Sequence, residues 1–266
     1  CDARKGASED DWEPAIPTDV LDPSGAGDAF FSGTTLALTR GLSMRKAVRA
    51  GTQAASRVLR SAENTIPAAK AVEMTPKLTW IGHASLKIQT AQGAVVYVDP
   101  YAPGDYSQPA DLILCSHEHS DHNAWQLAAQ KPGCRVLRAR DAINPDGSYN
   151  HFDIAGMKIE PVEAANKNHS PLTTSGYLLT FDGVTVYFAS DTNRVRGMEA
   201  LAGRRIDYAF FPIDGEYNMG PAEATECADL IGAAHNVPIH WFNADPNRFC
   251  AKNTLRMQPG ETIELR

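Results

Sequence analysis

The sequence lacks the cysteine pattern of a disulfide-stabilised or zinc-ribbon protein. Its five cysteines are scattered over 266 residues, their number is odd, and no two of them form a CxxC pair. Regular cysteine spacing is the signature of both disulfide frameworks and cysteine-rich zinc sites, so neither is indicated. Unpaired thiols of this kind are typical of proteins in a reducing compartment.

The sequence also lacks a long hydrophobic run. No apolar segment approaches the length needed to cross a bilayer, and the start, CDARKGASEDDW, contains no hydrophobic region of a signal peptide. Together with the unpaired cysteines, these absences predict a soluble, cytoplasmic protein with no membrane partner.

Positive charge is scarce as well. The chain has 25 Lys and Arg against 32 Asp and Glu, which gives a net charge of −7. Its basic residues between positions 40 and 60 are diluted by Ala, Leu and Gly. Without a basic patch, nucleic acid is not an expected partner. We therefore expect a small-molecule substrate, while the sequence leaves a homo-oligomer open.

What the chain does have is an ordinary globular composition, 43% hydrophobic and 21% charged, which is enough to bury a core. The pattern of residues changes near position 70. Before it, a helical stretch runs from about 34 to 60 with a break near Gly41, and Pro67 and Pro76 bracket a segment without periodicity. We therefore predict an appendage at 1–70, a linker at 71–76 and the main domain at 77–266.

Short apolar runs bounded by turn residues dominate the main domain and predict strands. They are LTWIG, SLKIQT, AVVYVD, DLILCS, CRVLRA, MKIEPV, GYLLTF, VTVYFA, YAFFPI and VPIH. Helical patterns fall at NAWQLAAQ, VRGMEALAG and PAEATECADLIGAAH. Because strands come in runs early and alternate with helices later, we predict a layered α/β sandwich rather than a doubly wound sheet.

The most informative motif is SHEHSDH, directly after the apolar run DLILC. In an extended segment alternate side chains point the same way, so His117 and His119 can reach one metal. A turn in which Asp121 caps a helix beginning near Asn123 would bring Asp121 and His122 beside a second metal. Histidine and carboxylate ligands suit zinc, and also manganese or iron.

Three further candidate ligands stand just beyond apolar strands: His169 in NHS, Asp191 in SDT and His240 in PIH. Loops at strand ends often carry functional groups, so all three are candidates for the rest of the metal site. Taken singly, each has an ordinary alternative: a loop histidine, a helix cap and a partly buried histidine, respectively.

The motif order IGHASLKI…VDPY…SHEHSDH…GYLLTFDGVTVYFASDT…NMGPAEA…VPIHWF resembles the metallo-β-lactamase superfamily, and within it the L-ascorbate-6-phosphate-lactonase-like branch. The resemblance covers the chain from about Leu78 onward and implies an αββα sandwich with a site at one edge between two sheets. With residues 1–70, the predicted fold is this α/β sandwich plus a small, mainly helical N-terminal appendage. The implied ligands are His117, His119 and His169 for one metal, and Asp121, His122 and His240 for the other, with Asp191 bridging.

The resemblance implies a binuclear metal-dependent hydrolase that acts on a lactone, ester or phosphoester of a small metabolite. Two divalent ions, Zn²⁺ or alternatively Mn²⁺ or Fe²⁺, would lower the pKa of a shared water and polarise the scissile group. Asp121 would orient the hydroxide or carry its proton. His83 matches a recurring histidine of the branch and is a second catalytic candidate; an ordinary turn histidine is the alternative. Oxygen-reducing diiron relatives usually carry Glu at the position of His119, which disfavours redox chemistry.

A second motif, DPSGAGDAFFSG, resembles the signature of ribokinase-like (PfkB-type) sugar kinases, and the resemblance continues to about Ile66. In that family the GAGD turn begins a helix, its N–H groups bind phosphate and its Asp is the catalytic base. The resemblance therefore assigns Gly25, Ala26 and Gly27 to an anion hole and Asp28 to the base. Only about two dozen residues precede the motif in this sequence, so we expect no sugar-binding half to accompany it. We expect 1–70 to be a vestigial carboxy-terminal kinase fragment joined by fusion.

Two competing hypotheses stay open. In one, residues 1–70 retain a sugar-kinase or nucleotide-binding function and are fused to a non-catalytic metal-binding domain. ATP binding that is lost in Asp28→Ala and Gly27→Val would favour it. In the other, the main domain binds metal as a scaffold and catalyses no turnover.

Overall fold

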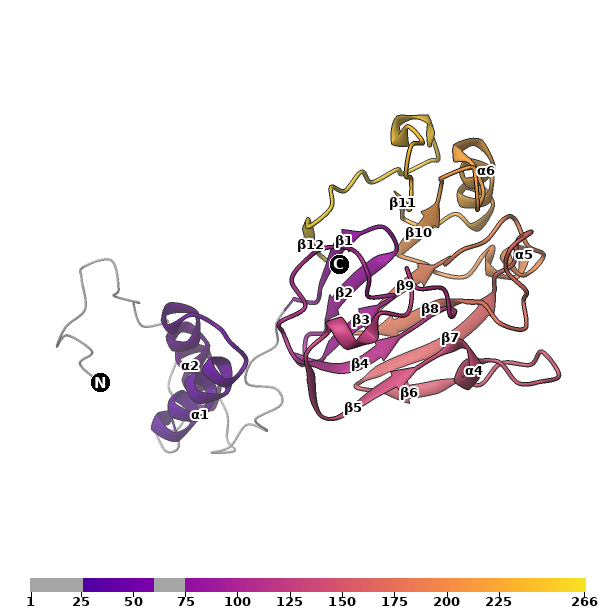
Figure 1. Ribbon diagram of the computed structural model, residues 1–266. Coiled ribbons are helices and arrows are strands. Elements are labelled where there is room, and N and C mark those ends of the chain that lie inside the picture. Colours follow the sequence, from indigo (N-terminus) through magenta and orange to yellow (C-terminus); the bar gives the residue numbers. More distant parts are fainter. Residues whose placement is uncertain (1–25, 60–74) are drawn as a thin grey trace. The chain divides into compact units, whose positions relative to one another are not determined.

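The chain divides into two compact units, Cys1–Met74 and Thr75–Arg266. The computed structural model describes residues 26–59 of the first unit and residues 75–266 of the second (Figure 1). The predicted linker at 71–76 therefore falls mostly outside the described residues.

The described part of the first unit is a pair of helices, α1 (Ala26–Thr39) and α2 (Met44–Leu59). They pack through the buried alanines Ala37, Ala47, Ala50 and Ala54. Gly51 permits the close approach, because a Cβ there would overlap the Thr34 hydroxyl of α1. The predicted break is confirmed at Gly41, whose φ is +76°. The first helix starts earlier than predicted, because packing against α2 holds a glycine-containing segment whose own helical propensity is weak.

No helix among the described residues of either unit is both long enough and apolar enough to span a bilayer.

The second unit is built from two six-stranded sheets (Figure 1). The first has the order β12 (Thr262–Glu264), β1 (Lys77–Gly82), β2 (Ser85–Gln89), β3 (Val95–Val98), β4 (Ala110–Leu114), β5 (Gln130–Leu137). The second has the order β11 (His235–Ile239), β10 (Tyr208–Pro212), β9 (Val184–Phe188), β8 (Ser175–Phe181), β7 (Met157–Glu163), β6 (Phe152–Ile154). Every strand predicted from the sequence is present. The two that were not predicted, β6 and β12, are too short to show a period of two.

The main core lies between the sheets, and strand alternation explains how it is filled. In β3, Val96 and Val98 face the shared core, whereas Tyr97 between them packs on the outer side. In β10, Phe210 faces the shared core and Phe211 packs outside it. Strands buried on both faces in this way appear in the sequence as continuous apolar runs.

The outer face of the second sheet is covered by α5 (Gly197–Leu201) and α6 (Pro221–Ile231), both predicted from the sequence. Gly232 ends α6 at φ +74°, a left-handed conformation in which glycine carries no Cβ penalty. A further short helix, α4 (Ala139–Ala142), follows β5. Two outer layers of helix and loop enclose the two sheets, which confirms the predicted α/β sandwich with a small helical N-terminal part.

The helix predicted at NAWQLAAQ is wrong. The structure has only a 3-10 turn, η2 (Trp125–Leu127), and its N-cap is Ala124, so Asp121 caps no helix. The physical reason is tertiary: the Ala124 N–H donates to the Pro100 carbonyl and the Ala129 N–H to the Tyr106 carbonyl. These bonds hold the segment along the loop after β3, and the second takes a donor that a longer helix would use.

Strand direction brings one set of strand ends to one edge of the sandwich. β3 runs parallel to β4, and β9 runs parallel to β10 and β11. β1 and β3 both run antiparallel to β2, and β7 and β9 both run antiparallel to β8. The carboxyl ends of β1, β3 and β4 therefore share an edge, as do those of β7, β9, β10 and β11. Functional residues of open α/β sheets collect at such ends.

Candidate metal centre

The loop after β4 carries the SHEHSDH motif. It is a series of bends rather than the extended strand that the alternation argument assumed. A tight turn, in which the His122 N–H donates to the His119 carbonyl, folds the loop back on itself. His117 and His122 are buried, with their rings 4.1 Å apart. The loop therefore brings its histidines together by turning, and not by strand alternation.

Three histidines form one possible metal-binding group, called here the His117 trio: His117, His119 and His169. Their ligand nitrogens all lie within 4.8 Å of one another. His169 comes from the loop after β7, on the second sheet, so both sheets contribute. His119 Nδ1 and His169 Nε2 are 3.0 Å apart. Two ring nitrogens that face each other at this distance suit a shared proton or a shared cation.

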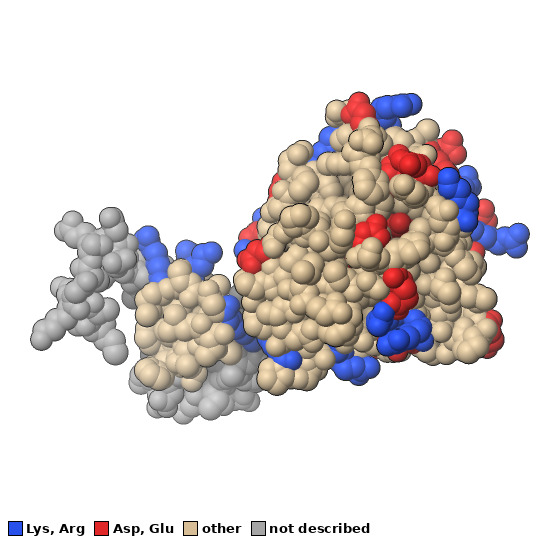
Figure 2. Space-filling view, in the orientation of Figure 1, with Lys and Arg blue, Asp and Glu red and all other residues tan. Residues whose placement is uncertain are grey.

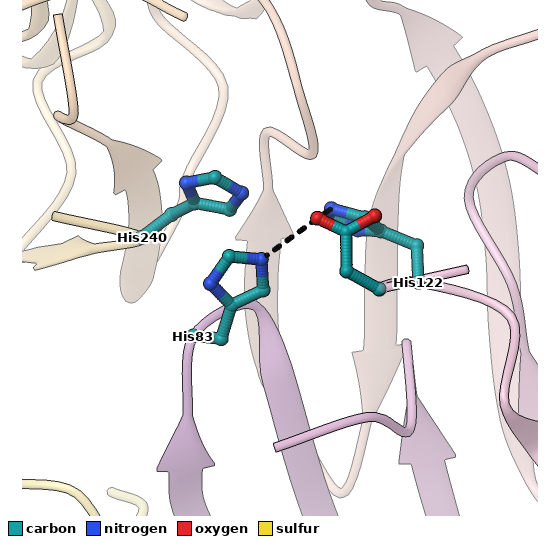
Figure 3. A group of neighbouring side chains, drawn as sticks. His83, His122 and His240 are labelled. Carbon is teal, nitrogen blue, oxygen red and sulfur yellow. Dashed lines mark hydrogen bonds and ion pairs between the residues drawn. The ribbon is translucent and has the colours of Figure 1, made fainter. Parts of the chain in front are cut away.

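A second group consists of His83, Asp121, His122 and His240, called here the His122 quartet, with ligand atoms within the same 4.8 Å limit. Figure 3 shows His83, His122 and His240 converging from three separate segments. The rings of His83 and His240 are 3.8 Å apart, and His83 Nε2 lies 3.2 Å from Asp121 Oδ2. The structure thus brings His83 to the same centre as the motif residues.

Asp191 lies between the two groups. Its Oδ1 is 3.3 Å from His122 Nε2 and 3.4 Å from His240 Nε2, while its Oδ2 is 3.7 Å from His169 Nε2. One carboxylate thus faces the quartet with one oxygen and the trio with the other. This is the position that a bridging ligand needs.

The donor atoms fit divalent metal ions. Four of them are buried without a hydrogen-bond partner: His117 Nε2, His122 Nε2, His240 Nε2 and Asp191 Oδ1. Buried polar atoms are nearly always satisfied, so a group of them that face each other without hydrogen-bond partners fits the coordination of a cation. Imidazole nitrogens with a carboxylate suit zinc, manganese or iron.

The centre also contains a residue that sequence reasoning missed, Asp99, which follows β3 and is fully buried. Its Oδ2 lies 2.7 Å from His122 Nδ1 and accepts from the Ser116 hydroxyl at 2.5 Å. Ser116 Oγ is in turn 3.0 Å from His117 Nδ1. Asp99 therefore orients His122 directly and His117 through Ser116. The signal was present in the sequence, because Asp99 ends an apolar strand as Asp191 does.

A second missed residue, Asp214, follows β10. Its Oδ2 is 3.1 Å from His240 Nδ1, and its Oδ1 accepts the N–H of Glu216, Tyr217 and Asn218. One carboxylate thus fixes both the ring of His240 and the loop that follows β10.

His169, in the trio, also has an orienting partner: Asn166 Oδ1 lies 2.7 Å from His169 Nδ1. Such partners set the tautomer and orientation of metal-binding histidines.

The electrostatic surroundings of the histidines differ. Burial, with neighbouring histidines, holds the pKa of His117 far below its usual range and also lowers the pKa of His169. Burial would lower the pKa of His122 too, but the carboxylates of Asp191 and Asp99 outweigh it and raise that pKa to about 9. For Asp121, burial opposes ionisation, yet the hydrogen bond from His83 and the charge of His122 lower its pKa well below the usual range.

Backbone strain gathers at the centre. Eight non-glycine residues of the described chain have positive φ, and five of them belong to this region: His83 at +51°, Asp99 at +44°, Ser190 at +60°, His240 at +50° and Phe242 at +42°. Each such residue costs roughly 1–2 kcal/mol, so the surrounding fold must hold it. The concentration of strain at one site is typical of functional geometry.

The anion-binding motif predicted from the sequence belongs to the first unit. Gly25 and the side chain of Asp28 lie outside the described residues, and α1 begins at Ala26. The anion hole assigned to Gly25, Ala26 and Gly27 stays a prediction.

The fold and the histidine–carboxylate centre match a known class. The profile of the Beta-lactamase superfamily domain matches residues 77–240, more than half of the chain. A UPF0173 metal-dependent hydrolase of Ligilactobacillus salivarius is 35% identical over 192 residues, 64% of this chain and 86% of the relative. One from Opitutus terrae is 30% identical over 229 residues, 71% of this chain and all of the relative. The chain therefore belongs to the β-lactamase superfamily and, within it, to the UPF0173 metal-dependent hydrolases.

Solved structures agree with the family. A protein of Parabacteroides distasonis assigned as a metal-dependent hydrolase is 28% identical, with a TM-score of 0.54 over 65% of this chain and 85% of its own. One from Thermotoga maritima, assigned to the zinc-dependent hydrolases of the metallo-β-lactamase superfamily, is 27% identical, with a TM-score of 0.51 over 65% and 84%. The predicted superfamily is thus confirmed, and the protein is a metal-dependent hydrolase of the metallo-β-lactamase fold.

The pfkB family carbohydrate kinase profile matches residues 4–71. Residues 26–59 of this segment are described, and the remainder, 4–25 and 60–71, lies outside the described residues.

Proposed function

We propose that the protein hydrolyses a lactone, ester or phosphoester of a small metabolite, using two divalent metal ions. The His117 trio would hold one, and Asp121, His122 and His240 of the His122 quartet would hold the other, with Asp191 between them. Zinc is the first choice of metal, and manganese and iron are the alternatives. The observation that carries the proposal is the set of four buried ligand atoms without a hydrogen-bond partner, which converge from both sheets.

The distribution of histidine supports the proposal. The chain has eight histidines, and six of them belong to the two groups. The other two, His151 and His235, are exposed and lie outside both groups. A histidine-rich surface without function would not gather its rings around one buried carboxylate.

The ions would supply an electrophile that polarises the scissile carbonyl or phosphoryl group and lowers the pKa of the attacking water. The chain's own part is orientation. The Asp121 side chain is one-third exposed, so its carboxylate can accept a hydrogen bond from the water and direct it. His83 is a positioning residue in this scheme, because it holds Asp121 at 3.2 Å. Overall, water adds its oxygen to the acyl or phosphoryl centre, and the leaving oxygen takes a proton.

A small molecule is the proposed substrate. On the face drawn in Figure 2, Lys and Arg of the larger unit are interspersed with Asp and Glu and form no continuous stripe. Nucleic-acid enzymes usually need such a basic surface.

The test is elemental analysis by inductively coupled plasma mass spectrometry on tag-free protein before and after chelation, paired with hydrolysis assays on lactone, ester and phosphodiester panels. We expect about two ions per chain, and turnover that disappears with chelation and returns with metal. His151→Ala and His235→Ala are matched controls that should keep both metal and activity. Protein that never holds metal, even after reconstitution, would contradict the proposal, and so would fully metallated protein that is inert on every panel.

A further inference from the structure

Three half-exposed aromatic side chains are called here the aromatic rim: Tyr101, Tyr217 and Phe242, which are 45%, 46% and 53% exposed. Tyr101 and Phe242 contact the histidines of the quartet, and Tyr217 contacts Phe242. The ring of His83 lies 5.4 Å from that of Tyr101 and 5.1 Å from that of Phe242, and Phe242 lies 6.2 Å from Tyr217. All three contacts have edge-to-face geometry. The rim therefore continues the metal centre outward as an aromatic surface.

Most of the strongly exposed large apolar side chains in the described part of the second unit belong to the rim. In the described part of the second unit, the other large apolar side chains that are strongly exposed are Leu127 and Leu172. Single exposed apolar residues are ordinary, but aromatic rings gathered at the edge of a polar centre typify a ligand-binding surface. Binding sites combine a few polar groups with aromatic walls in this manner.

The backbone of the rim residues is held in place before any ligand binds. The Tyr101 N–H donates to Ser85 Oγ and Tyr106 Oη, each at 3.1 Å. The Tyr217 N–H donates at 2.6 Å to Asp214, the carboxylate that also orients His240. Phe242 follows His240 by two residues and has the strained φ of +42°. Surfaces held in their binding conformation lose little entropy when a ligand binds.

We propose that the aromatic rim binds a planar, apolar group of the substrate, fused or attached beside the ester or lactone group that is hydrolysed. The inference rests on the proposed function and narrows its substrate class to carbon-rich, benzo-fused or aryl-bearing esters and lactones. Edge-to-face contact between rim and substrate rings supplies the affinity. The rim lies on the quartet side, so the carbonyl meets the centre beside Asp121 and His83. Hydrolysis adds water across the acyl C–O bond, and a lactone opens to a hydroxy acid.

The first experiment measures binding without turnover. The probe is 2-naphthol, which is neutral, planar and not hydrolysable, titrated into metal-loaded full-length protein and followed by saturation-transfer NMR. We expect Phe242→Ala and Tyr217→Ala to weaken binding about tenfold, the loss expected when an aromatic contact and its buried area are removed. Leu127→Ala, an exposed apolar truncation outside the rim, should bind as the unmodified protein does. Phe242→Leu keeps the apolar bulk and separates loss of the ring from loss of the fold.

The second experiment uses two lactones whose leaving group is an alkoxide, isochroman-3-one with a fused benzene ring and δ-valerolactone without one. We expect the ratio of their kcat/KM values to fall about tenfold in Phe242→Ala and to stay constant in Leu127→Ala. Rim-dependent naphthol binding in a fully metallated protein that is inert on both lactones and on the ester, lactone and phosphodiester panels would support the rim and defeat the hydrolase proposal. Hydrolysis with a ratio that no rim variant changes, or naphthol binding equal in all variants, would overturn the rim and leave the hydrolase standing.

Discussion

The His117 trio and the His122 quartet differ in what holds their histidines. In the trio, neutral groups do so: Ser116 contacts His117 and Asn166 contacts His169. In the quartet, carboxylates do so: Asp99 faces His122 and Asp214 faces His240. A carboxylate partner makes an imidazole a stronger ligand and fixes its ring more firmly. We therefore expect the two halves to bind metal with unequal affinity, the quartet more tightly than the trio.

The largest expected effect is the loss of metal from both halves of the centre. Asp191→Ala deletes the carboxylate that both halves share, so we expect both ions to be lost and kcat/KM to fall by at least about 10³-fold. Elemental analysis and lactone hydrolysis measure the two losses, and circular dichroism checks the fold. Two retained ions with unimpaired turnover would show that Asp191 does not bridge the halves.

The next largest effect concerns the carboxylates that orient the quartet's histidines and their contribution to metal affinity. Asp99→Asn and Asp214→Asn each replace an orienting charge by an amide of the same shape, and we expect affinity for the quartet's ion to fall about 10–100-fold. Asn166→Ala, which removes a neutral partner from the trio, should cost less than either. Competition with a chromophoric chelator gives the affinities. An equal or larger loss in Asn166→Ala would reverse the ranking of the halves.

A smaller effect is expected in the order in which the unmodified protein loses its two metal ions. Limiting chelator should remove one ion before the other, and the trio's ion should leave first because its partners are neutral and His119 is exposed. With cobalt in place of the native metal, the two sites would be resolved by their visible spectra during titration. His119→Ala should then abolish the early phase alone. Loss of both ions in a single phase, in every variant, would mean that the halves are not energetically distinct.

The sequence predicted much of this centre because the relevant signals are local. His117, His119 and His122 share one short motif, and His169, Asp191 and His240 each follow an apolar strand. Parallel and alternate strands of a sandwich bring such ends to one edge, so strand prediction was enough to predict the fold class and to nominate these residues. Asp99 and Asp214 carry the same strand-end signal but were not nominated as site residues.

The rest depended on tertiary structure. The NAWQLAAQ segment has a helical pattern, yet its N–H groups bond to the loop after β3, and no local propensity encodes that choice. The exposure of Tyr101, Tyr217 and Phe242 beside one another follows from chain segments far apart in sequence. Positive φ at histidine, aspartate and phenylalanine has no sequence signature either, because these residues adopt it only where the fold compels them.

The smallest expected effect concerns the backbone strain of Phe242, at the edge of the quartet. Phe242 has φ +42°, where an L-residue with a Cβ is penalised and glycine is not. We compare two truncations, both of which remove the ring: Phe242→Gly should be more stable than Phe242→Ala by about 1 kcal/mol, since relief of strain exceeds the entropy that glycine adds to the unfolded chain. Urea unfolding measures the difference. At Leu127, equally exposed but in a 3-10 turn, the order should reverse, with Ala the more stable. Alanine matching or exceeding glycine at Phe242 would mean that the backbone there relaxes freely, and that the rim is not held in its conformation by the fold.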